Sequence, residues 1–134
     1  IEKSESFDEF SKLFYSDSLF QLNRIIFPLE NDKKIEKEYT SALRGSDNIE
    51  MHKKNNYHPY NKNNWVFLNN AHFKDNDSIA IIEGITYKRR FHKTNKFVEE
   101  NLIHSDDEFV MVILKFKSIN GKWYLIDYID GFAY

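Results

Sequence analysis

The stretch Val112–Ile129, VILKFKSINGKWYLIDYI, decides the fold class. At its centre, Asn120-Gly121 is the strongest hairpin signal in the chain, because both residues tolerate a positive φ. Alternating apolar and polar side chains on either side predict antiparallel strands over residues 109–118 and 123–129. The C-terminal part of the chain therefore predicts an antiparallel sheet.

The register of this hairpin places a carboxylate on an apolar face. Counting outward from the two-residue turn pairs Phe116 with Leu125 and Leu114 with Asp127. Charged side chains are almost never fully buried without a partner. Asp127 is therefore expected to have a partner on another part of the chain.

Arg24 presents the same problem near the start of the chain, in the stretch Phe20–Leu29, FQLNRIIFPL. We predict a strand over residues 24–29, in which alternation places Arg24 on the same side as Phe20 and Ile26. We predict an architectural ion pair between Arg24 and Asp127. Two alternatives remain open: Arg24 binds a ligand carboxylate or phosphate, or its guanidinium reaches water along the surface.

The N-terminal residues predict an amphipathic helix. Ser6 and Glu9 fit a capping box, and Phe7, Phe10 and Phe14 recur at helical spacing. Asp17 or Ser18 is expected to begin a second short turn. Three further strands are predicted, over residues 78–82, 85–92 and 97–103. This order of elements predicts the α+β class, with an N-terminal helix packed on an antiparallel sheet.

Composition excludes several classes of protein. The 134 residues suit a single domain over 1–134, and 41% hydrophobic and 16% aromatic residues allow a substantial core. The chain has no cysteine, which excludes disulfides and cysteine catalysis. Its net charge of −2 argues against nucleic acid as a partner, and no apolar run is long enough to span a bilayer. The histidines lack metal-site spacing, so neither a metal nor another cofactor is expected.

A long loop or insertion is expected at about residues 31–64. Within it, the stretch Ile35–Leu43 predicts a helix that ends at Gly45. Tyr57 and Tyr60 lie in an aromatic, asparagine-rich part of the loop. They could stack on sugars or peptides, but we favour a role as anchors that pack the loop onto the sheet.

Several residues match the pattern of a known domain family: Asp17, Phe20, Gln21, Arg24, Phe27-Pro28-Leu29, Trp65, Phe116, Gly121, Trp123 and Leu125. On these residues the chain resembles a domain family of unknown function from secreted or lipid-anchored proteins of anaerobic gut bacteria. The resemblance implies the nuclear-transport-factor-2-like, or cystatin-like, fold, in which a curved antiparallel sheet wraps an N-terminal helix, often with a conical pocket between them. It also implies a location in the bacterial cell envelope, and it brings no catalytic residues.

Three functions compete on this basis. The first is a non-catalytic envelope module that binds a small molecule or an envelope protein through a concave pocket. The second is an isomerase or dehydratase with Asp127 as base, and the third is a structural homodimer that pairs through the open face of the sheet. Candidate pocket residues are Arg24, Asp127, Trp65, Tyr87 and Trp123. Candidate helpers in catalysis are Tyr87, His92, Tyr124 and Tyr128. We favour the first function, because pairing with Arg24 would make Asp127 a poor base.

Overall fold

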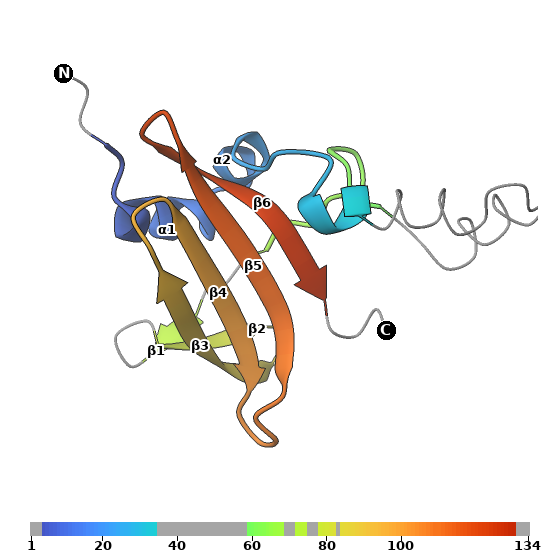
Figure 1. Ribbon diagram of the computed structural model, residues 1–134. Helices are drawn as coiled ribbons and strands as arrows, with labels where there is room; N and C mark the ends of the chain where they lie inside the picture. Colours follow the sequence, from blue (N-terminus) through green and yellow to red (C-terminus); the bar gives the residue numbers. More distant parts are fainter. Residues whose placement is uncertain (1–3, 35–58, 69–71, 75–77, 83, 131–134) are drawn as a thin grey trace, which may run out of the picture.

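The computed structural model describes residues 4–34, 59–68, 72–74, 78–82 and 84–130 (Figure 1). Two N-terminal helices precede the strands: α1 spans Phe7–Phe14 and α2 spans Ser18–Asn23. The strands are β1 His72–Lys74, β2 Ile79–Ile82, β3 Ile85–Lys93, β4 Phe97–His104, β5 Val110–Ile119 and β6 Lys122–Asp130. The predicted early helix and late strands are confirmed, and the fold is α+β.

The described strands form one antiparallel sheet in the order β1-β2-β3-β4-β5-β6. Each strand pairs with its neighbours in the sequence, so the sheet is a simple meander. Figure 1 shows that strands β3 to β6 are curved. The short connections explain this order, because an antiparallel pair can be joined by a tight turn.

Helix α1 forms as its sequence predicts. The Ser6 side chain accepts a hydrogen bond from the Glu9 backbone N–H at 3.1 Å and caps the first turn. Phe7, Phe10 and Phe14 lie on one face of the helix and are buried against the sheet. Their rings pack edge-on against Phe116 at centroid distances of 5.2, 5.6 and 5.4 Å. This aromatic cluster is the centre of the core and fixes the helix on the sheet.

The β5–β6 hairpin has the predicted turn. Asn120 and Gly121 both adopt positive φ, at 52° and 80°, as the two-residue turn requires. The predicted pairing of Phe116 with Leu125 is also confirmed.

Beyond Phe116 the predicted register of the hairpin is wrong. A shift between Lys115 and Phe116 places Asp127 opposite Lys115 and Tyr128 opposite Leu114. One extra residue on β6, Ile126, produces this β-bulge, which a count from the turn cannot detect. The predicted register would pair Tyr128 with Ile113 on the open face of the sheet, where it would support a homodimer. In the structure Tyr128 packs against the core instead.

The predicted strand over residues 24–29 is also wrong. Asp17 caps α2 by accepting hydrogen bonds from the N–H groups of Leu19 and Phe20, and the helix extends to Asn23, so Arg24 is its C-cap. Only Ile25 makes a sheet contact, a single parallel bridge to Leu125. The apolar alternation in this stretch therefore reflects a short helix followed by a bend and not an extended strand.

Several other expectations concern the region between α2 and β1. The predicted helix over Ile35–Leu43 and its end at Gly45 lie outside the described residues. Residues 30–34 are helical, and residues 65–68 run without regular structure. In the described ranges, no helix is long and apolar enough to cross a membrane.

Candidate functional site

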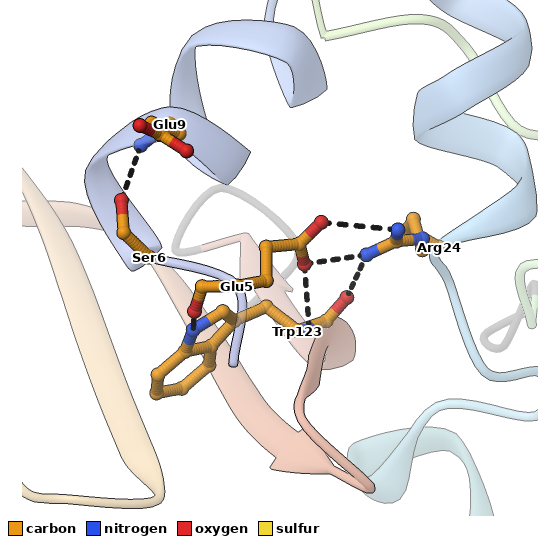
Figure 2. Close-up of polar contacts among 5 residues, drawn as sticks. All are labelled: Glu5, Ser6, Glu9, Arg24 and Trp123. Atoms are coloured by element: carbon orange, nitrogen blue, oxygen red, sulfur yellow. Dashed lines mark hydrogen bonds and ion pairs between the residues drawn. The ribbon is translucent and has the colours of Figure 1, made fainter. Parts of the chain in front are cut away.

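Arg24 binds the N-terminal segment and the last hairpin. Its guanidinium donates to both carboxylate oxygens of Glu5, at 2.7 and 3.1 Å, and to the Trp123 carbonyl at 3.1 Å (Figure 2). The Glu5 carboxylate also accepts from the Trp123 N–H at 3.0 Å, and the Glu5 carbonyl accepts from the indole N–H at 3.0 Å. We call Glu5, Arg24 and Trp123 the terminal clasp.

The surroundings of the clasp make Glu5 a stronger acid. Burial raises the pKa of Glu5, but hydrogen bonds from Arg24 and Trp123 and the charges of Arg24 and Lys122 outweigh it and lower the pKa. The Arg24 guanidinium also lies 4.7 Å from the Phe20 ring centroid. The hydrogen bonds of the Arg24 guanidinium in Figure 2 all end on Glu5 or Trp123, so this side chain connects separate parts of the fold.

The predicted ion pair between Arg24 and Asp127 is wrong. The Asp127 side chain accepts instead from the backbone N–H groups of Asn31 and Tyr128, at 2.9 and 3.0 Å. Asp127 is only 4% exposed, so these bonds replace water for a buried carboxylate. The bond to Asn31 caps the first turn of the helical residues 30–34.

The core contains a second charged cluster, which sequence reasoning missed. The Arg89 Nε donates to Glu100 at 2.9 Å, and the Tyr15 hydroxyl donates to the other Glu100 oxygen at 2.7 Å. The side chains of Arg89 and Glu100 are 3% and 0% exposed. Strand alternation carried the signal, because Arg89 lies between Tyr87 and Phe91 on one face of β3. We call Tyr15, Arg89 and Glu100 the core triad.

Gln21 is fully buried, and its side-chain amide is satisfied on both ends. Its nitrogen donates to the carbonyls of Phe14 and Leu68, and its oxygen accepts from the Trp65 indole and the Leu68 N–H. The four bonds, between 2.7 and 3.1 Å, connect residues 65–68 to both helices. These four bonds explain how an amide can be fully buried at position 21 of this chain.

Trp65 and Tyr60 do come together, as anchors of the loop. The rings of Tyr60, Trp65 and Tyr128 form a triangle with centroid distances of 5.4 to 5.5 Å, and Phe27 lies 6.0 Å from Trp65. For Tyr60 this agrees with the anchoring role that we favoured. Tyr57 lies outside the described residues.

The candidate pocket residues are not brought together at one place. Arg24 and Trp123 meet in the terminal clasp, whereas Trp65 lies in the aromatic triangle beside Tyr128. Tyr87 is buried in the core, with its ring 6.3 Å from that of His104.

The proposed catalytic helpers also diverge. Tyr87 and Tyr128 pack on the inner face of the sheet, whereas His92 and Tyr124 alternate onto the outer face. Within the part of the chain that the structure describes, no three His, Asp or Glu side chains are grouped to hold a metal ion. The candidate pocket and catalytic residues that the structure describes thus do not form a single site.

Comparisons with known proteins agree with this fold. A protein structure from Bacteroides uniformis superposes with a TM-score of 0.64 at 21% identity, covering 100% of this chain and 82% of the other. A cystatin-like protein from Bacteroides caccae gives a TM-score of 0.59 at 19% identity, covering 99% of this chain and 80% of the other. A Bacteroides ovatus protein gives 0.57 at 22% identity, with 100% and 79% covered. No curated protein matches the sequence.

The helices and the antiparallel sheet form an α+β fold of the cystatin-like kind. A protein-family model matches residues 5–134. The chain belongs to this family, a family of unknown function with the cystatin-like fold.

Proposed function

We propose that this chain is a non-catalytic binding module of the bacterial cell envelope. One observation carries the non-catalytic part: the buried carboxylates that could act as bases are already committed to the protein. Asp127 accepts two backbone hydrogen bonds, and Glu100 is held by Arg89 and Tyr15. A general base must reach the proton that it removes, and such carboxylates are poorly placed to do so.

The inner face of the sheet offers further support. The rings of Phe7, Phe10 and Phe14 fill the space between α1 and the sheet, where the fold family places its pocket. A ligand bound at that point would have to displace core side chains, at the cost of their packing. The envelope location is supported by the resemblance to secreted and lipid-anchored domains.

Carboxyl labelling tests the non-catalytic assignment. The folded domain would be treated with a water-soluble carbodiimide and an amine, and the modified sites read by mass spectrometry. We expect Asp8, whose side chain is 83% exposed, to react, and Asp127 and Glu100 to be protected until the domain is unfolded. Rapid labelling of Asp127 in the folded domain would contradict the assignment and favour the isomerase or dehydratase instead.

Fractionation and crosslinking in the producing cells test the remaining parts. The envelope location predicts that the full protein is recovered with the periplasmic, membrane or secreted fraction, and recovery with the cytoplasm alone would overturn it. The binding role predicts a discrete crosslinked adduct of the wild-type protein in those cells. Its absence under conditions that crosslink a known envelope complex would overturn the role.

A further inference from the structure

The outer face of the sheet carries an excess of positive charge. Because Tyr87 faces the core, alternation places Lys88 and Arg90 on the outer face of β3. Lys115 and Lys117 lie on the same face of β5, since they pair through Glu99 and Phe97 of the intervening strand β4. We call these four cations, Lys88, Arg90, Lys115 and Lys117, the outer cationic face. It contrasts with the net charge of −2 of the whole chain.

Part of this charge is balanced on the same face, because Glu99 lies in the cross-strand row between His92 and Lys115, and Asp127 lies opposite Lys115 on β6. Lys88 pairs with Glu108 at 3.3 Å, and the Lys117 ammonium lies 5.6 Å from the Phe97 ring centroid. Arg90 and Lys115 have no ion-pair partner among the residues that the structure describes. Charged groups left in this way raise the local potential and attract a partner of opposite charge.

A buried acceptor lies beneath the same surface. Asn101 is the cross-strand neighbour of Arg90 and Ile113, and it is 6% exposed although it faces outward. Its Oδ1 has no hydrogen-bond partner within the described ranges, while its amide nitrogen donates to Glu99 at 3.4 Å. Buried acceptors in native proteins nearly always have a hydrogen-bond donor. Because the Oδ1 atom is itself buried, Asn101 serves here only as a probe of the strand beneath Arg90.

Aromatic side chains border the cations. Phe97 is 47% exposed, and Lys117 lies between Phe97 on β4 and Tyr124 on β6 in a cross-strand row. Interfaces are enriched in aromatic residues and arginine, which provide apolar contact beside directed polar bonds. A polypeptide with acidic and apolar side chains would complement both the cations and their aromatic neighbours.

We propose that the outer cationic face binds an extended, acidic segment of a partner protein. Alternate residues of a strand are about 7 Å apart, so Lys115 and Lys117 match carboxylates at every second position of an extended segment. Lys88 and Arg90 repeat that spacing two strands away. The inference rests on the proposed binding role and names its surface and the chemistry of its partner.

Titration with a designed peptide tests this surface. The probe is a labelled decapeptide of alternating glutamate and threonine, and the controls are its lysine–threonine counterpart and a peptide of the same composition with clustered glutamates. We expect saturable binding of the alternating peptide, weakened by salt, with amide shifts in NMR spectra at the four cations and Asn101. Absence of binding, or shifts confined to another surface, would overturn the proposal.

Charge reversal provides the matched variants. Arg90→Glu with Lys115→Glu is expected to weaken peptide binding by about tenfold or more, because both unpaired cations become repulsive. Lys12→Glu with Lys62→Glu makes the same change of charge at exposed positions of α1 and the 59–68 segment, and is expected to leave the affinity unchanged. Equal effects of the two double variants would contradict a localised site.

Two further outcomes would assign the face differently. Tighter, charge-dependent binding of a DNA oligonucleotide would make nucleic acid the partner and overturn the polypeptide assignment. Peptide-independent self-association that the first double variant abolishes would make the occupant a second copy of the chain. If the partner crosslinked in cells is still captured by the Arg90→Glu, Lys115→Glu variant, the proposed surface is wrong although the binding role stands. If the wild-type protein captures no partner, the binding role itself is wrong.

Discussion

The terminal clasp and the core triad use the same chemistry in two different surroundings. Each joins an arginine to a glutamate with a further aromatic partner, Trp123 in one and Tyr15 in the other. The side chains of Arg24 and Glu5 are 15% and 21% exposed, whereas those of Arg89 and Glu100 are almost inaccessible. The comparison shows how burial decides what an ion pair contributes to the fold.

Burial works in two directions in such pairs. Removal of both charges from water costs several kcal/mol per ion. The attraction between the two charges offsets this cost only if the geometry of the pair is excellent. A buried pair is therefore weak evidence for net stability, but loss of one partner leaves an uncompensated charge. The clasp retains access to water, so its broken form can be hydrated at smaller cost.

The largest effect is expected from breaking the core triad. Arg89→Met leaves Glu100 buried without its cation, and the free energy of unfolding should fall by about 3–5 kcal/mol. Urea unfolding followed by fluorescence measures this change. A loss below about 1 kcal/mol would show that Glu100 does not depend on Arg89.

The matched variant replaces the whole triad by apolar residues. Tyr15→Phe with Arg89→Met and Glu100→Leu removes all three polar groups together, and should recover most of the stability that Arg89→Met loses. If the triple variant is less stable than the single one, the triad contributes net stability rather than a fixed arrangement of the core.

A smaller effect is expected at the clasp. Arg24→Ala removes the bidentate bond to Glu5 and should lower the free energy of unfolding by about 2 kcal/mol. Arg24→Lys keeps the charge but not the planar two-bond geometry, so it should recover only part of the loss. The exposed pair of Lys88 and Glu108 supplies the control, because Lys88→Ala should change stability by no more than about 0.5 kcal/mol.

The smallest expected effects are changes of stability with pH, which differ in direction between the terminal clasp and the core triad. The folded pKa of Glu5 lies below its ordinary value of 4.5, so its contribution is present above that value and is lost as the pH falls through the folded pKa. The difference in unfolding free energy between wild type and Glu5→Gln should therefore shrink in acid. A difference that stays constant down to pH 3 would contradict the assignment.

The core triad gives the opposite dependence. Burial, followed by the negative charge of Glu100, raises the pKa of Tyr15 well above its ordinary value of 10.0. Its contribution is complete below pH 10 and is lost as the pH rises toward the folded pKa. Comparison of wild type with Tyr15→Phe should show the difference shrinking only in alkali.

The elements with strong local signals were predictable from the sequence. Ser6 and the phenylalanines of α1 specify a helix by capping and periodicity, and Asn120-Gly121 specifies the hairpin by backbone conformation. These signals act within a few residues, so their outcome depends little on the rest of the chain.

The partners of the charged residues were not predictable in the same way. Arg24 and Glu5 are 19 positions apart, and Trp123 lies 118 positions from Glu5. The bulge on β6 also changed the neighbours of Asp127 by one residue. Strand alternation applied to Arg89 and Glu100 would have marked both as charges on the inner face, though not which residue each of them binds.

The bridge between Ile25 and Leu125 has a consequence for how the domain behaves in a crowded solution. An uncovered edge strand presents free N–H and C=O groups to which strands of other molecules can add. At β6 the Leu125 N–H donates to the Arg24 carbonyl at 2.7 Å, and its carbonyl accepts from the Ile26 N–H at 3.0 Å. Pro28, which has no N–H, follows two residues later and prevents continuation of a ladder. The stretch FQLNRIIFPL thus blocks the middle of a sheet edge against aggregation.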